Sequence, residues 1–371
     1  MKRYIKTTGA AAITLAALTA CHHIEEWNND VYGNFDALWT VMDEHYCFFR
    51  EKGIDWDEVG ARYRAQLKPD MTQRELFDIC ADMLAELKDG HTNLSSWFNM
   101  SYYRKWWSDY PQNFDWRLIQ EHYLDFDYTT ANGMSYKVLA DGKVGYCRFA
   151  SFAYSVSDSF VNEMMTTMKD TNGMIIDVRD NGGGALTGVE TLASHFINER
   201  TLAGYIQHKT GPGHDDFSEP YPYYYDPAMG VRWLKPVIVL ANRSTYSAAN
   251  NFVSVMKGFE HVAVAGTTTG GGSGAPFSSE IPCGWAVRFS GSPIYDADKR
   301  LTEHGVDPSP GFEIQMDTTA AVNGHDTMLD FCIDVILNIK TAVIGIASEW
   351  VSLSADRRGP SEKSKIISAL Y

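Results

Sequence analysis

Apolar side chains recur every three or four residues after a short polar stretch near residue 30, a spacing typical of helices with one buried face. They are Phe35, Leu38, Trp39, Met42, Tyr46 and Phe49. A second helix is expected over residues 56–67, and Thr72 followed by Glu75 forms the capping box of a third helix. The pattern predicts a small helical domain over residues 33–92, whose last helix delivers His91 just after a glycine stop.

Over residues 136–340 the pattern changes, and short apolar runs of strand length alternate with amphipathic stretches of helix length. Strands are expected at residues 144–149, 173–178, 236–240, 261–265 and 284–289, with helices over 160–168, after the glycines that end at 184, and from 247 onward. Strands that alternate with helices in this way predict an α/β core.

Residues 93–135, between the two predicted domains, are rich in aromatic side chains without a clear period. Flat rings of this kind line a sugar- or peptide-binding cleft, or they pack a long connector over the core. The sequence leaves both interpretations open, and the segment is defined only as an aromatic-rich connector. Residues 341–371 match no element of the pattern and form a predicted C-terminal tail.

The N-terminus has the features of an export signal. Three basic residues among the first six precede an apolar, small-residue stretch over 7–20, which is short for a membrane span and typical of a signal peptide over residues 1–20. Residues 18–21, Leu-Thr-Ala-Cys, resemble the lipobox of bacterial lipoproteins, which implies that Cys21 is acylated. We expect a lipid-anchored protein of the cell envelope, at the periplasmic face or the cell surface, with residues 21–32 as a linker. An ordinary secretory signal with a coincidental cysteine stays open.

The composition describes a folded body, because 44% of the residues are apolar and 13% are aromatic. A formal net charge of −15 without any basic run excludes nucleic acid as a main partner. None of the six cysteines lies in a Cys-x-x-Cys pair, so a thiolate metal site is not expected. Four of them lie in apolar segments, which is typical of buried free thiols, and the sequence leaves disulfide pairing open.

Ser247 follows the predicted strand at 236–240 and opens a predicted helix. A serine there lies at the positive end of the helix dipole, among amides without a helical partner. Such amides could stabilise both an alkoxide and a developing oxyanion, which suits a nucleophile. Serine is also a preferred N-cap residue, so the position alone does not distinguish a nucleophile from a helix cap.

Three consecutive glycines, Gly182, Gly183 and Gly184, separate the predicted strand at 173–178 from the next helix. Glycine lets the backbone approach a ligand closely, so amides of this loop could complete an oxyanion hole. The same residues would also make a permissive turn. No Gly-Lys-Ser/Thr follows, which excludes a P-loop.

Four segments together resemble the tail-specific, or carboxyl-terminal processing, serine proteases and the tricorn-core-like branch of the same superfamily. Residues 175–186 read IIDVRDNGGGAL against the family's IIDLRNNGGGAL, and residues 244–250 resemble its SASASE nucleophile segment. Residues 87–92 resemble its L-x-D-G-H-T, and residues 302–308 resemble its Y-E-G-x-G-V-x-P-D. The resemblance covers residues 33–340 and implies an N-terminal helical domain with a crotonase-like or ClpP-like α/β core.

The resemblance implies Ser247 as the nucleophile. The processing proteases pair this serine with a lysine about 25 residues later, but Gly272 stands at that place and no lysine lies nearby. The tricorn-like arrangement remains, with His91 as general base and Glu303 orienting it. The amides implied to hold the oxyanion are those of Gly183, Gly184 and Ala248.

The chain also departs from the family in two other ways. Residues 93–135 are too few for the PDZ domain of the processing proteases, so specificity for a substrate's tail is not implied. The expectation is an exported, lipid-anchored serine endopeptidase that hydrolyses peptide or protein substrates through an acyl-enzyme, without cofactor or metal. Asn250 stands where the family has Glu, which keeps open a non-catalytic binding module that holds an apolar ligand or peptide on the same fold.

Overall fold

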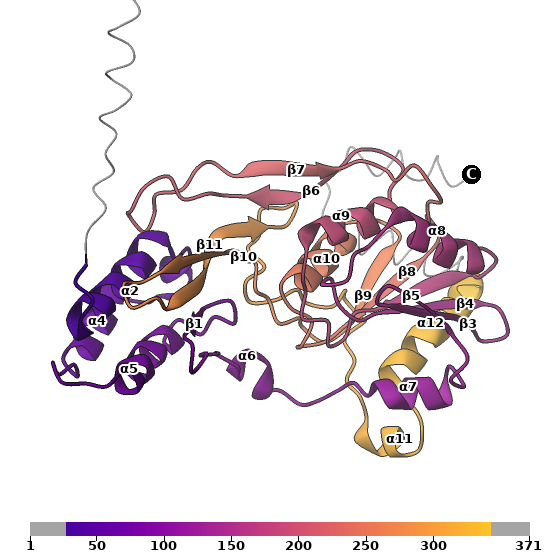
Figure 1. Ribbon diagram of the computed structural model, residues 1–371. Helices are drawn as coiled ribbons and strands as arrows, with labels where there is room; N and C mark the ends of the chain where they lie inside the picture. The colour runs from indigo at the N-terminus through magenta and orange to yellow at the C-terminus, as the bar shows by residue number, and fades with distance from the viewer. Residues whose placement is uncertain (1–26, 343–371) are drawn as a thin grey trace, which may run out of the picture.

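The computed structural model describes residues 27–342 (Figure 1). The predicted signal peptide, its Cys21 and nearly all of the predicted tail at 341–371 lie outside these residues. None of the helices in the described part combines the length and the apolar character needed to cross a bilayer. Its five cysteines are free thiols. Those at 80, 147 and 332 are buried, as their apolar surroundings predict, whereas Cys47, which also lies in an apolar segment, is only half-buried.

The described chain alternates helices and strands. The helices are α2 (Val31–His45), α3 (Phe49–Lys52), α4 (Trp56–Arg64), α5 (Gln73–Ala85), α6 (Lys105–Ser108), α7 (Trp116–His122), α8 (Asp158–Thr167), α9 (Leu186–Ser194), α10 (Ala248–Lys257), α11 (Thr318–Val322) and α12 (Thr327–Ala342). The strands are β1 (Asn93–Ser95), β2 (Thr129–Ala131), β3 (Met134–Leu139), β4 (Val144–Phe149), β5 (Gly173–Asp177), β6 (Thr201–Ile206), β7 (Tyr221–Tyr225), β8 (Val237–Ala241), β9 (Val262–Gly266), β10 (Gly274–Glu280) and β11 (Ala286–Tyr295).

A six-stranded sheet in the order β2-β3-β4-β5-β8-β9 forms the centre of the larger body. Strands β4, β5, β8 and β9 run parallel, and β2 and β3 complete one edge as antiparallel strands. The buried strands β4, β5, β8 and β9 are the apolar runs expected from the sequence, so the prediction of an α/β core is confirmed.

Helices cover both faces of this sheet because successive strand residues point to opposite sides. Ile176 and Val239 pack in one apolar cluster with side chains of α8, α9 and α10. Ile175 and Ile238, their neighbours in sequence, pack in a second cluster with α7 and α12. Figure 1 shows α7 and α12 on the face of the sheet opposite α8 and α9. Buried on both sides, the central strands have continuous apolar sequences rather than alternating ones.

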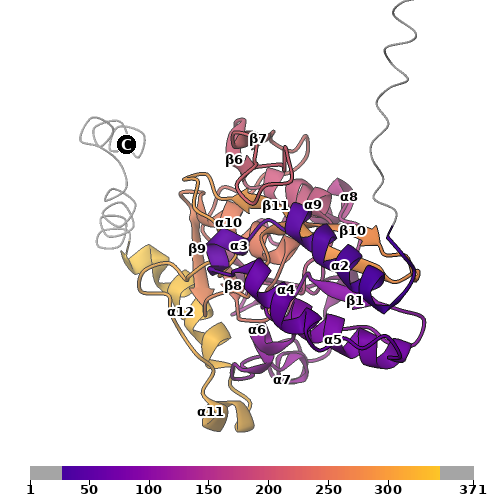
Figure 2. The same cartoon turned by 90° about the vertical axis from the view of Figure 1, so that its left-hand side faces the viewer.

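The N-terminal helices form a second body whose core is shared with a distant hairpin. Helix α2 packs on β11 and α5 on β1, while α4 packs on α2 and α5 (Figures 1 and 2). Their apolar side chains share one core with the β10–β11 hairpin, which belongs to a second sheet in the order β1-β11-β6-β7. The hairpin side chains in that core are Ile281, Trp285, Val287 and Phe289. A helical body over residues 33–92 was predicted, but part of its core comes from residues 274–295.

Local helix signals place the end of the helical body. Thr72 and Glu75 make both hydrogen bonds of the predicted capping box, which starts α5. Helix α4 ends at Arg64, before the predicted residue 67, because the N–H groups of Gln66 and Leu67 donate to carbonyls only three residues earlier. The chain after α5 then leads through a tight turn to His91.

Candidate active site

Ser247 lies at a sharp turn between β8 and α10. Its φ of +58° and ψ of −124° are unusual for a residue other than glycine, and such strain is held only where surrounding bonds fix the backbone. The N–H of Ser247 donates to the Gly271 carbonyl at 2.9 Å, and the N–H of Tyr246 donates to the Asn181 carbonyl at 3.0 Å. Although Ser247 is the N-cap of α10, its side chain makes no capping bond. The hydroxyl is therefore available to another partner.

That partner is His91, whose Nε2 lies 2.9 Å from Ser247 Oγ. The His91 backbone N–H donates to Asp89 Oδ1 at 2.8 Å, which fixes the turn after α5. The imidazole is 4% exposed and packs on the Tyr246 ring, with 5.0 Å between ring centroids. The Gly274 carbonyl lies near the ring and favours its protonated form, but Nδ1 makes no hydrogen bond of normal geometry. The serine of the α/β body and the histidine of the helical body thus meet at one point.

The surroundings of His91 favour the neutral imidazole. Burial lowers its pKa to about 4, and the charges of Arg288 and Lys52 also lower it, while Asp89 raises it. At pH 7 the ring is therefore uncharged, and its Nε2 can accept a proton from Ser247 Oγ. This is the protonation state that a general base needs.

Glu303, the third residue expected from the sequence, lies in the same buried region but makes no hydrogen bond to His91. Its Oε2 accepts the Ser273 N–H at 2.9 Å, and its Oε1 lies 3.0 Å from Lys52 Nζ. Burial and the charge of Asp89 raise the pKa of Glu303 to about 7, against the opposing effect of Lys52. Ser273 directly precedes Gly274, so Glu303 holds the backbone whose carbonyl lies near the His91 ring.

The glycine loop lies directly against the serine. A Cβ on Gly183 would come within 2.8 Å of both Ala248 N and Ser247 Cβ, so only glycine allows this approach. The N–H of Gly183, which the resemblance implied for the oxyanion hole, donates instead to Asn181 Oδ1 at 3.0 Å. The N–H groups of Gly184 and Ala248 make no hydrogen bond to the part of the chain that the structure describes, and Ala248 is the first residue of α10. These two amides are free to bind an anion.

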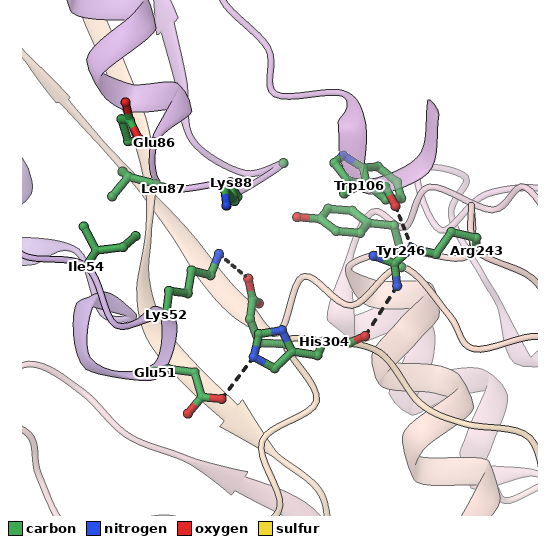
Figure 3. Close-up of a pocket in the computed structure, with 13 residues that line it drawn as sticks. Glu51, Lys52, Ile54, Glu86, Leu87, Lys88, Trp106, Arg243, Tyr246 and His304 are labelled. Atoms are coloured by element: carbon green, nitrogen blue, oxygen red, sulfur yellow. Dashed lines mark hydrogen bonds and ion pairs between the residues drawn. The ribbon is translucent and has the colours of Figure 1, made fainter. Parts of the chain in front are cut away.

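A cavity of about 330 Å³ lies between the helical body and the serine turn (Figure 3). Lys52 and Leu87 line one side of it, and Trp106 and Tyr246 line the other. Trp106 stacks on Tyr246 with ring centroids 4.0 Å apart, and its carbonyl accepts from Arg243 Nε at 2.6 Å. At this point the aromatic connector packs against the core beside the cavity, and its role in binding a sugar or peptide stays a prediction.

Known proteins with similar sequences and structures identify the family of this chain. Residues 143–310 match peptidase family S41, and residues 28–85 match the tricorn protease C1 domain. A crystal structure of a protein from Parabacteroides merdae ATCC 43184, assigned as a peptidase, is 49% identical and superposes with a TM-score of 0.80, covering 84% of this chain and 98% of that one. The chain belongs to peptidase family S41. This is a family of serine proteases.

More distant relatives include a carboxy-terminal processing protease and a tricorn-like protease. Carboxy-terminal processing protease CtpB of Bacillus subtilis is 26% identical over 138 residues, which is 37% of this chain and 27% of that protein. A tricorn-like protease C-terminal subunit of Sulfurisphaera tokodaii is 24% identical over 229 residues, 59% of this chain and 24% of that protein. The chain thus spans about a quarter of the length of these curated relatives.

Sequence reasoning missed several groups around His91. Asp89 lies inside the quoted L-x-D-G-H-T segment, and an acid two residues before a candidate base was a usable signal. Tyr246 precedes the serine directly, and its bulk in a small-residue motif was a weaker signal. Lys52 and Arg288 lie far from every motif, and only the fold brings them near the site.

Proposed function

We propose that this S41 family member is a serine endopeptidase in which Ser247 is the nucleophile and His91 the general base. The proposal rests on one observation, the contact of 2.9 Å between Ser247 Oγ and His91 Nε2. Ser247 is the N-cap of α10 by position, but its hydroxyl faces a neutral imidazole instead of capping the helix. A serine that serves only as a cap would bond to the helix amides.

In the proposed reaction, His91 Nε2 takes the Ser247 proton while Oγ attacks the carbonyl carbon of the scissile peptide bond. The oxyanion that forms is held by the amides of Ala248 and Gly184, while Gly183 keeps the loop close to the serine. His91 then gives its proton to the leaving amine. Water, deprotonated by His91, releases the acyl group and restores the free hydroxyl.

We assign to Glu303 an orienting role that acts through the backbone. Its Oε2 holds the Ser273 N–H at 2.9 Å, next to the Gly274 carbonyl beside the His91 ring. A carbonyl at that place favours the ring orientation in which Nε2 points to the serine. The proposed role differs from the triad implied by the resemblance, because Glu303 contacts the Ser273 amide and Lys52 and makes no hydrogen bond to His91 itself.

A fluorophosphonate probe, which reacts with activated serines, tests this proposal. The wild-type protein should be labelled, while Ser247→Ala and His91→Ala should each lose labelling or peptide turnover by on the order of 10³-fold or more at unchanged melting temperature. The double variant should lose little more than either single variant. An unlabelled wild-type protein would instead support the binding-module alternative, and a fully active His91→Ala would remove the base assignment.

The pH dependence of labelling gives an independent check. A free imidazole would place the acidic fall in rate at about pH 6–7. Because burial lowers the pKa of His91 to about 4, its base form persists to lower pH, and the fall should lie near pH 4. The same shift contributes stability that is present above about pH 6.5 and is lost as the pH falls toward 4.

We also propose that the protein is exported and held at the cell envelope by lipid on Cys21, since residues 18–21 resemble a lipobox. Detergent phase partitioning measures this directly. The wild-type protein should enter the detergent phase and Cys21→Ser the aqueous phase, and equal partitioning would contradict the anchor. Its substrates would be peptides or proteins of that compartment.

A further inference from the structure

Lys52, the last residue of α3, carries a charge from the helical body into the buried region around the site. Its Nζ lies 3.0 Å from Glu303 Oε1, and the two side chains are 10% and 5% exposed. The ammonium also lies over the Tyr46 and Phe48 rings, 5.9 and 5.5 Å from their centroids. A lysine is rarely buried without a partner, and here the partner is a carboxylate of the other body.

Lys52 offsets two buried carboxylates rather than one. Asp89 is 1% exposed, and its oxygens accept from the His91 N–H and the Ser290 hydroxyl. Burial would raise the pKa of Asp89, but Lys52 first and His91 next hold it below its usual range. Burial would lower the pKa of Lys52 itself, but Asp89 and Glu303 raise it, so the ammonium stays charged. In the buried region around the site, Lys52 is therefore the shared cationic partner of two carboxyl groups, those of Asp89 and Glu303.

Charged groups from three different elements act on the buried His91 ring. Asp89 lies on its own turn, Arg288 on β11 and Lys52 on α3, and these are the charged groups that act on its ring. Its other neighbours are uncharged, because burial keeps the Tyr246 hydroxyl protonated and Ser247 is neutral. With Lys52 removed, the ring would lose one of the positive charges that oppose its protonation, and the charge of Asp89 would favour a proton on the imidazole.

We infer that Lys52 is a positioning residue of the peptidase reaction, which balances the charges of Asp89 and Glu303 and so keeps His91 free to accept the Ser247 proton. This inference rests on the proposed role of His91. Lys52 is not the base, because Glu303 holds its ammonium group and it makes no hydrogen bond to Ser247 within residues 27–342. The helical body thus supplies both the base, His91, and the cation, Lys52, that keeps this base unprotonated.

The test measures the rate of fluorophosphonate labelling between pH 3.5 and 8.5. The acidic limb is the pH at which the labelling rate falls to half of its plateau on acidification. Lys52→Gln keeps a polar group near Glu303 but removes the charge, so it should raise this limb by on the order of one pH unit. Lys52→Arg keeps the charge and should keep the wild-type limb even if the rate at the plateau falls. Lys88→Gln is the matched control, because Lys88 lines the same cavity but is exposed, and its limb should not move.

A purely structural role of Lys52 would lower the plateau rate and leave the limb in place, and that result would overturn the inference. If Lys52→Gln alone fails to fold, the acidic limbs of Asp89→Asn and of the double variant Asp89→Asn/Lys52→Gln are compared instead. The double variant removes one buried cation together with one buried anion, so the net charge of the buried region does not change. The limb of the double variant must then lie above that of Asp89→Asn. Failure of the proposed function is separate, since it would appear as normal labelling of His91→Ala.

Discussion

Two neighbouring glycines of the 182–184 loop differ in what they do. Gly183 has a φ of +95°, and a Cβ there would lie 2.7 Å from the Tyr246 carbonyl oxygen and 2.8 Å from Ala248 N. Gly182 has nothing within 4 Å of its Cβ position and no positive φ. Only Gly183 is thus required by the approach of the loop to the serine turn, although the sequence shows three equivalent glycines.

We predict that Gly183→Ala slows acylation of Ser247 by about 10²-fold or more, because its Cβ would push the serine and the Ala248 amide out of position. Gly182→Ala should label at nearly the wild-type rate. Fluorophosphonate labelling rates, with melting temperatures as a folding check, give the comparison. Equal rates for the two variants would show that the glycine loop does not position the serine.

At the scale of elements, a buried ion network joins the end of β5 to the start of α12. The Arg179 guanidinium donates to Asp177 and Asp326, and all three side chains are fully buried. Asp326 also accepts from the N–H groups of Met328 and Leu329 at the start of α12. Strand β5 leads into the glycine loop and then to α9 on one face of the sheet, and this network joins β5 to α12 on the other face.

We predict that Arg179→Met lowers the free energy of unfolding by about 3–5 kcal/mol, because two buried carboxylates lose their cation. Arg200→Met is the matched control. Arg200 pairs with Asp226 at 3.2 Å, but both side chains are more than 60% exposed, so its loss should change stability by at most about 1 kcal/mol. Urea unfolding followed by tryptophan fluorescence measures both, and a similar small loss for Arg179→Met would contradict the network's role.

For the whole molecule, the site lies where two bodies meet, and the two bodies are not independent. Val287 and Phe289 of β11 and Trp285 beside it are buried among side chains of α2, α4 and α5. The helical body therefore takes part of its core from a hairpin that is nearly 200 residues away in sequence. Movement of this hairpin would also move Arg288, one of the charges around His91.

We predict that a fragment of residues 27–92 does not fold alone, because its apolar helix faces would have no hairpin to cover them. Circular dichroism of the fragment should show reduced helicity and no cooperative thermal transition, whereas the chain of residues 27–342 should melt with one. A cooperative melt of the fragment would show that the helical body is a separate domain.

The sequence alone determined the local structure. Helical spacing and the Thr72–Glu75 capping box placed the N-terminal helices, and apolar runs placed β4, β5, β8 and β9, because these signals depend on neighbours within a few residues. The resemblance of short motifs to a known family also indicates Ser247, His91 and Glu303. These choices required only residue types at fixed spacing.

Tertiary structure decided what those residues can do. The Ser247 hydroxyl faces His91 rather than the helix amides, and Glu303 holds Lys52 and the Ser273 amide rather than the imidazole. Neither arrangement is visible in a local pattern, because each joins segments that are far apart along the chain. The same holds for the lowered pKa of His91, since burial and nearby charges set it and both exist only in the folded protein.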